Sequence, residues 1–272
     1  MSVKASTVVQ RIDDALDAEK REKARMYIGA SGIGNTCDAL QAFSLRGFPN
    51  REPDARLKRI FQLGHILEDE VVKDLKRADF SVYEKDGLTG KQHAYYEWGG
   101  HISCHTDGLI DIGDDNLRIL EIKSMNDSSH QKFKKSGVKI SHPQYFAQLQ
   151  TMMAMSNIHS SFFIAINKNT SSYAAEIIAF DEFEWAALKH RIETVLHGNA
   201  AKIATDESDW RCRGCFKADV CWHDAEVEVR CSTCAFANPK EDGGWQCGKH
   251  EREAFEVCED YEIYKPKNRE LI

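Results

Sequence analysis

Long apolar runs are missing from this sequence, and so is an excess of positive charge. None of its 272 residues lies in a stretch that approaches the about 20 apolar residues needed to cross a bilayer. Its 36 basic and 43 acidic residues give a net charge of -7, which argues against a general electrostatic attraction to nucleic acid. Because its first residues are polar and charged, we expect no secretory signal, no membrane partner and a cytoplasmic location.

Cysteine, by contrast, is abundant. In a reducing compartment nine cysteines are not expected to form disulfides, and clustered ones indicate metal binding. Eight of them fall into two groups with plausible ligand spacing. The ninth, Cys104, is expected to be a small buried residue of a strand.

The apolar spacing predicts an α/β protein. Helices are expected over 5–27 and from Pro53 to Phe80, then again over 143–155 and 181–198. Asp181 and Glu184 fit an N-cap pair for the last of these, and Gly198 fits its end. Strand-like runs occupy 80–85, 93–98, 101–112, 117–124, 161–168 and 173–180. A turn-forming Gly-Asp-Asp-Asn separates 101–112 from 117–124, which predicts an antiparallel hairpin.

Two acids and a lysine fall on this hairpin. Because side chains alternate between the faces of a strand, Asp107 is expected to share a face with His101 and His105, and Glu121 with Lys123. If the strands pair, the three functional groups converge. Two carboxylates make a hard oxygen site for Mg²⁺ or Mn²⁺, and a lysine can orient a water or neutralise charge on a phosphate. The alternative is an ordinary exposed Glu–Lys pair.

Two helices supply further polar residues near this position. Glu68 lies in line with Phe61, Gly64 and Val71 at helical spacing, and an inward carboxylate is costly unless it meets a cation. Gln148 lies in line with buried-type residues of its own helix. Either residue could instead be a satisfied polar group of the core.

The order G-x-x-x-E on a helix, D-G, E-I-K and a following glutamine helix resembles the PD-(D/E)XK nuclease superfamily over roughly residues 30–200. The likeness is greatest to its RecB-like and lambda-exonuclease-like branch. It implies a restriction-endonuclease-like mixed β-sheet core flanked by helices, with a cysteine-rich C-terminal metal-binding extension. It also implies metal ligation by Asp107, Glu121 and the Ile122 carbonyl, a catalytic Lys123, and supporting roles for Glu68 and Gln148.

The resemblance predicts a metal-dependent DNA exonuclease of phage or bacterial recombination, repair or replication, acting on single- or double-stranded DNA ends in a bacterial or phage-infected cell. The lysines from Lys132 to Lys139 would guide the phosphate backbone; the alternative for the stretch from Lys123 to Lys139 is a solvated loop. RecB-like members often carry Q-x-x-x-Y, whereas Met152 stands at that last position. This departure makes the helix more similar to that of phage-type exonucleases. The alternative function is a non-catalytic nucleic-acid-binding or scaffold protein on a nuclease fold.

The first cysteine group has the pattern C-x2-C-x5-C, which leaves a tetrahedral centre one ligand short. Some RecB-like nucleases, including AddB and a CRISPR-associated adaptation nuclease, complete this pattern with one cysteine ahead of the core and bind a [4Fe–4S] cluster. The resemblance implies such a cluster here, and zinc is the alternative because four thiolates suit it too. The ligands would be Cys37, Cys212, Cys215 and Cys221.

The second group reads as a zinc-ribbon-like knuckle formed by Cys231, Cys234, Cys247 and Cys258, in which His250 could replace one cysteine. A module of about 45 residues builds little core alone, so a metal would supply its stability. It could contact DNA, dock a recombination or replication protein, or cap the first site. We therefore expect an N-terminal helical segment (1–30), a nuclease core (31–204), an iron–sulfur clasp (205–225) and this tail (226–272).

Overall fold

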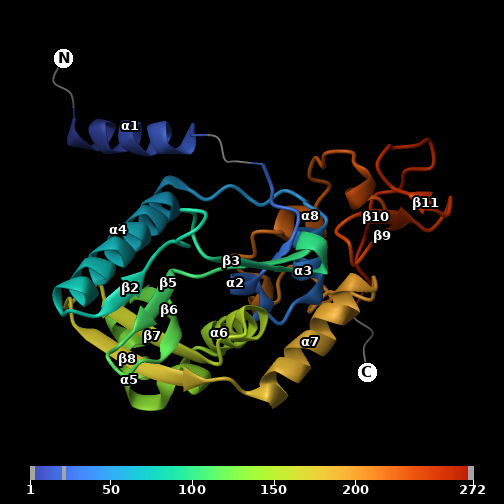
Figure 1. Cartoon of the computed structure of the whole chain (residues 1–272). Helices are drawn as coiled ribbons and strands as arrows, with labels where there is room; N and C mark the ends of the chain where they lie inside the picture. Colours follow the sequence, from blue (N-terminus) through green and yellow to red (C-terminus); the bar gives the residue numbers. More distant parts are fainter. Residues whose placement is uncertain (1–3, 20–22, 269–272) are drawn as a thin grey trace.

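A mixed five-stranded sheet forms the centre of the computed structural model, which describes residues 4–19 and 23–268. Its strand order is β2 (Ser81–Tyr83), β5 (Gly108–Asp111), β6 (Leu117–Met125), β7 (Ser160–Asn167) and β8 (Tyr173–Ala179). β6 and β7 are parallel and the other neighbours are antiparallel. The predictions of a mixed α/β fold and of a β5–β6 hairpin are confirmed (Figure 1).

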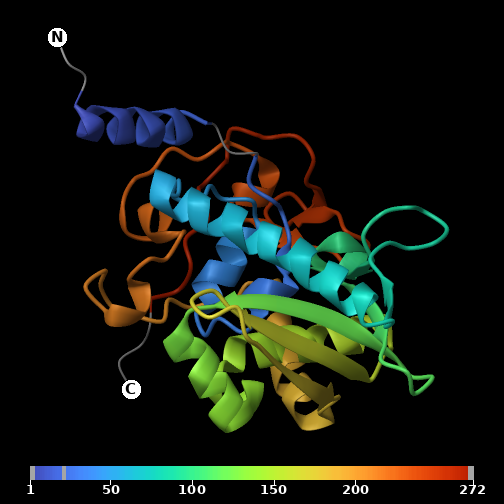
Figure 2. The same cartoon turned by 90° about the vertical axis from the view of Figure 1, so that its left-hand side faces the viewer.

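Helices cover both faces of this sheet (Figure 2). Helix α4 (Ala55–Arg77) packs on one face, while α5 (Asp127–Ser141) and α6 (Pro143–Ser156) pack on the other. Because successive side chains of β6 point to opposite faces, Leu120 and Ile122 meet α4 and Ile119 meets the α6 side. Burial on both faces makes β6 the central strand of the core.

Two elements differ from the sequence-based expectations, and a third agrees with its predicted start. The expected helix over 5–27 is α1 (Ala5–Asp17), and residues 20–22 of that range lie outside the described residues. The lysine-rich stretch after Lys123 is helix α5, begun by Asn126 as N-cap, rather than the loop considered for it. The helix predicted to start at Asp181 is α7 (Glu182–Leu196), and the Asp181 side chain caps it as expected.

The strand expected over 101–112 is broken, which corrects the predicted face of Asp107. Its first half is β4 (Ile102–His105), which pairs with β1 (Ile28–Gly29) and β3 (Ala94–Glu97) in a separate sheet. Its second half is β5 of the main sheet. Alternation therefore does not run through Asp107, and His101 and His105 are not on its face.

Short elements complete the chain. Two short helices lie between α1 and α4: α2 (Ala30–Ile33) and α3 (Asp38–Leu45). Beyond α7 lie α8 (Ala218–Trp222) and a small antiparallel sheet of β9 (Ala237–Pro239), β10 (Trp245–Cys247) and β11 (Arg252–Glu253). Three 3-10 turns cover Trp98–Gly100, Trp210–Cys212 and Cys231–Thr233. No helix within 4–19 and 23–268 has both the length and the apolar content of a membrane span.

The C-terminal tail packs against the rest of the chain, beyond α3 and away from the main sheet (Figure 1). His101 Nε2 lies 3.0 Å from the Gly244 carbonyl oxygen, and its ring meets Trp245 edge to face at 5.2 Å. Close by, Gly99 and Gly243 touch through their backbones: a Cβ on Gly99 would lie 2.1 Å from the Gly243 nitrogen. Only glycine fits that contact.

We expect Gly99→Ala to loosen the tail. Gly90 is the matched control, because it has a similar positive φ (+66° against +55°) and open space around its Cβ position. Gly99→Ala should cost about 2 kcal/mol of unfolding free energy more than Gly90→Ala, since overpacking adds to the shared backbone strain. Urea denaturation measures the difference, and equal losses would contradict this packing.

Candidate active site and cysteine sites

The candidate active site lies where β6 extends past the end of β5. Pairing of β5 with β6 begins at Gly108 and Leu120, so β6 beyond Leu120 has a strand neighbour on the β7 side. Asp107 directly precedes β5, and its Oδ2 accepts a hydrogen bond from the Ile122 backbone nitrogen at 2.7 Å. The carboxylate thus accepts the hydrogen bond that the backbone carbonyl of a neighbouring strand would otherwise accept from Ile122. This position puts it beside the Ile122 backbone, whose carbonyl the resemblance also assigns to the metal.

Glu121 and Lys123 form an ion pair at this edge, and Gln148 of α6 joins them. Gln148 donates from Nε2 to Glu121 Oε1 at 2.8 Å. The other oxygen of Glu121, Oε2, is buried and has no hydrogen-bond partner within the described part of the chain. A buried carboxylate oxygen without a donor is expected at a cation site.

Tyr145 is a neighbour of Lys123 that the sequence did not single out for this contact. The lysine Nζ lies 5.3 Å from the centre of the Tyr145 ring, which stacks on His142 at 5.3 Å. The signal was its position three residues before Gln148, which places both on one side of α6. Tyr145 and Glu121 therefore limit where the lysine can point.

Glu68 approaches the site from α4, and its charge raises the pKa of both Asp107 and Glu121. Its Oε2 lies 3.2 Å from His65 Nδ1, a contact that the sequence did not predict. Helix α4 passes β6 at Gly64, where a Cβ would lie 3.9 Å from Ser124 Oγ in ordinary van der Waals contact. Of the residues predicted to share an inward face with Glu68, Val71 is buried, but Phe61 is 40% exposed.

The electrostatics of these groups are unbalanced. Burial, followed by the charge of Glu121, raises the pKa of Asp107 to about 8. Burial also raises the pKa of Glu121. For Lys123, burial opposes the charged form, but Glu121 and Asp107 outweigh it and raise its pKa. One ammonium therefore faces two carboxylates that burial leaves short of positive charge, and a divalent cation fits this deficit.

The first cysteine group surrounds one cavity of about 230 Å³, to which all four thiols contribute. Cys37 is the N-cap of α3, and Cys221 lies in α8. Burial raises the pKa of Cys221 to about 11, Lys202 opposes this, and Cys37, Cys215 and Cys212 raise it further. Arg191 fixes the start of α3 by donating to Asp38 Oδ1 at 2.6 Å. Chain segments on either side of the core thus meet at this cavity.

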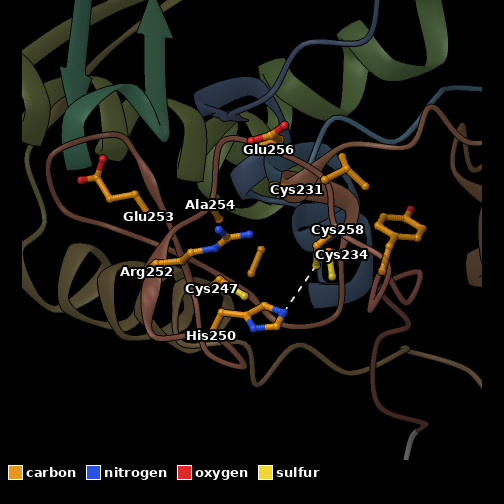
Figure 3. Close-up of a pocket in the computed structure, with 12 residues that line it drawn as sticks. Cys231, Cys234, Cys247, His250, Arg252, Glu253, Ala254, Glu256 and Cys258 are labelled. Carbon is orange, nitrogen blue, oxygen red and sulfur yellow. Dashed lines mark hydrogen bonds between the residues drawn. The ribbon is translucent and has the colours of Figure 1, made fainter.

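The second group lines a much smaller cavity of about 20 Å³ (Figure 3). Burial raises the pKa of the Cys231 thiol, and Cys234, Cys258 and Cys247 add to it. His250 Nε2 lies 3.5 Å from Cys258 Sγ and 3.1 Å from Asp260 Oδ2. Among the described residues, ligand atoms of His250, Cys258 and Asp260 lie within 4.8 Å of one another. Asp260 was not predicted, and its only signal was its position two residues after Cys258.

The two cavities differ in what they can hold. A water molecule needs about 10–15 Å³ of cavity volume. The second cavity therefore has room for little more than one ion, whereas the first has room for a multi-atom cluster. Burial, together with the neighbouring thiols, raises the pKa of Cys221 and of Cys231, and a bound cation would favour their thiolate forms. Thiol ligands of this kind would suit a cation in either cavity, and the first cavity could hold the larger group.

Comparison with known proteins places these residues in a family context. A family model described as a YqaJ-like viral recombinase domain matches residues 51–159, less than half of the chain. The matched segment contains all five predicted residues of the active site: Glu68, Asp107, Glu121, Lys123 and Gln148. No curated protein matches the chain.

Among solved structures, the chain is similar to an alkaline exonuclease from Laribacter hongkongensis, with 20% identity over 69% of this chain and 90% of that one and a TM-score of 0.44. A complex of that exonuclease with dAMP matches at 19% identity over 62% and 86%, with a TM-score of 0.40. A phage-related exonuclease from Haemophilus somnus 129PT matches at 14% identity over 63% and 92%, with a TM-score of 0.44. These superpositions are loose. The family match agrees with the lambda-exonuclease-like resemblance read from the motifs, and it does not extend to the cysteines.

Proposed function

We propose that this chain is a metal-dependent DNA exonuclease of phage or bacterial recombination. The observation that carries the proposal is the meeting of Asp107, Glu121 and Lys123 at one buried edge of β6, where a Glu121 oxygen has no donor. A non-catalytic scaffold has no use for this arrangement, because burying two carboxylates beside one lysine costs stability. The family described as a viral recombinase domain favours recombination over other DNA transactions.

Each side chain has a defined task in this proposal. Asp107 and Glu121, with the Ile122 carbonyl, hold Mg²⁺ or Mn²⁺; a bound ion of this kind polarises a phosphodiester and lowers the pKa of its water. Lys123 stays protonated, since its pKa is raised; it therefore orients the attacking water and offsets phosphate charge rather than removing a proton. Gln148 fixes the Glu121 carboxylate, and Glu68 adds negative charge nearby.

The DNA backbone would run along α5. Lys132, Lys134 and Lys135 are all exposed on this helix, which starts directly after β6. The net charge of -7 does not oppose this, because phosphate contacts depend on local rather than mean charge. The substrate is thus guided to the strand that carries Glu121 and Lys123.

Replacement of Lys123 tests the catalytic assignment. Lys123→Met keeps the length of the side chain and removes the charge, so cleavage of end-labelled DNA with Mg²⁺ or Mn²⁺ should slow by about 10²–10³. Lys91→Met, the same change on an exposed loop residue, should leave the rate unaltered. A folded Lys123→Met protein that cleaves at the wild-type rate would refute the assignment.

The raised pKa of Asp107 predicts how metal-free stability changes with pH. Its pKa is about 8 in the folded chain against an ordinary 3.8, so its contribution is full below pH 3.8 and is lost as the pH rises through about 8. Glu121 acts in the same direction. In EDTA, unfolding free energy should fall by about 2–4 kcal/mol between pH 5 and pH 8.

Two comparisons check this pH dependence by urea denaturation. Asp107→Asn should flatten it, because the amide does not titrate. Mg²⁺ should stabilise the wild type more at pH 8 than at pH 5, since a cation favours the charged carboxylates. An equal slope in Asp107→Asn would show that this carboxyl is not the source.

For the cysteine groups we propose a [4Fe–4S] cluster on Cys37, Cys212, Cys215 and Cys221, and Zn²⁺ in the tail on Cys231, Cys234, Cys247 and Cys258. The difference between cavities of about 230 and about 20 Å³ supports this assignment. Four thiolates suit both centres. His250 and Asp260, both close to Cys258, are side chains that could exchange with a tail cysteine.

Elemental analysis of anaerobically purified protein tests both assignments. The wild type should contain iron and sulfide together with one equivalent of zinc. Cys37→Ser should lose the iron and keep the zinc, whereas Cys104→Ser should keep both, because Cys104 is buried in β4 and belongs to neither group. A colourless protein that contains zinc alone would overturn the cluster assignment.

A further inference from the structure

Helix α3 connects the two cysteine sites through its two ends. Its N-cap is Cys37, a thiol of the first site, and its C-cap is Arg46. The backbone nitrogen of Cys37 donates to Asn35 Oδ1 at 2.9 Å, which fixes the first end. The helix between them, Asp38–Leu45, is mostly buried. A displacement at one end is therefore carried to the other.

Arg46 is 3% exposed and reaches into the tail. It donates to three carbonyl oxygens: those of Ser232 at 3.0 Å, Cys234 at 2.9 Å and Ala237 at 2.8 Å. Its guanidinium lies 3.9 Å from the centre of the Tyr264 ring. A buried charge without such acceptors is strongly destabilising, so the position of Arg46 depends on where these carbonyls lie.

The three carbonyls belong to the segment that the second cysteine site shapes. Cys234 N donates to the Cys231 carbonyl at 2.9 Å, which closes the turn between the first two thiols. In return, Ser232 Oγ donates to the Arg46 carbonyl at 3.1 Å. A metal bound by Cys231 and Cys234 would fix the geometry of this turn. The carbonyls of the turn fix the position of Arg46 by accepting its hydrogen bonds.

A side-chain contact runs parallel to this backbone route. Phe43 of α3 lines the cavity of the first site, and its ring meets Tyr264 of the tail edge to face at 6.3 Å. Tyr264 N in turn donates to the Thr233 carbonyl at 2.8 Å, inside the same turn. Phe43 therefore lies at the first cysteine group, and Tyr264 is hydrogen-bonded to the turn of the second.

We propose that Arg46 is a positioning residue that couples metal binding at the two cysteine sites, so that each site binds its metal more tightly when the other is filled. The inference rests on the proposed cofactors and not on the nuclease activity. Such coupling is reciprocal for binding free energies. It would make the tail a support for the first site rather than an independent module.

A double-mutant cycle on zinc affinity tests the coupling in the full-length chain. The dissociation constant of the tail zinc is measured by chelator competition in wild type, Cys37→Ser, Arg46→Met and the double variant. Cys37→Ser should weaken zinc binding about tenfold although it lies outside the tail site. In the Arg46→Met background the same change should have little further effect.

Arg230→Met is the matched control, because Arg230 donates to the Gly47 carbonyl at 2.8 Å beside Arg46 but not to the three tail carbonyls. The tenfold effect of Cys37→Ser should survive in it. Unchanged zinc affinity in Cys37→Ser, after loss of the first-site metal is verified, would overturn the proposal, as would an undiminished effect in Arg46→Met. Arg46→Lys, which keeps the charge, replaces Arg46→Met if the latter does not fold.

The outcomes separate this inference from the assignments beneath it. If the first site holds zinc instead of iron, the same cycle applies and the coupling stands or falls alone. If the wild-type tail binds no zinc, both the coupling and the tail assignment fail. Whether the Lys123 variant loses DNA cleavage or keeps it has no bearing on either result.

Discussion

Two carboxylates and one ammonium group share a buried edge of β6, and much of the core is arranged around that imbalance. β6 is covered by α4 on one face and by α6 on the other, so Glu121 and Lys123 have little water to stabilise their charges. The protein itself supplies partial compensation: Gln148 donates to Glu121, and the Ile122 backbone donates to Asp107. Neither adds positive charge, so the deficit remains for a cation.

The same constraint explains why the main sheet stops where it does. Had β4 and β5 formed one strand, the edge of β6 next to Ile122 would be paired along its length and Asp107 would point to one face of a continuous sheet. The break at Thr106–Asp107 sends β4 to another sheet. It leaves a strand edge at which a carboxylate can replace a backbone partner. The irregularity in the fold is what creates the site.

The sequence was sufficient where local patterns report on local structure. Long amphipathic α4, the Asp181 cap and the hairpin turn were all readable, because spacing and turn chemistry determine them directly. The proximity of Asp107 to Glu121 and Lys123 was predicted by an incorrect route, because the alternation argument assumed an unbroken strand. The motif resemblance named the same three residues without that assumption. Tyr145, His65 and Arg46 were missed in their contacts, since each acts through tertiary neighbours that no spacing reveals.

Arg46 shows how a small cysteine-rich tail can matter to a core that lies outside it. Residues 226–268 form three short strands and one 3-10 turn, so their own packing contributes little and contacts with α3 help to fix them. Burial lowers the pKa of Arg46 to about 10, which still leaves it charged at neutral pH. A charge buried at 3% exposure fixes the three carbonyls as firmly as they fix it. The tail and the core therefore hold each other in place, and the end of α3 that carries Cys37 is held along with them.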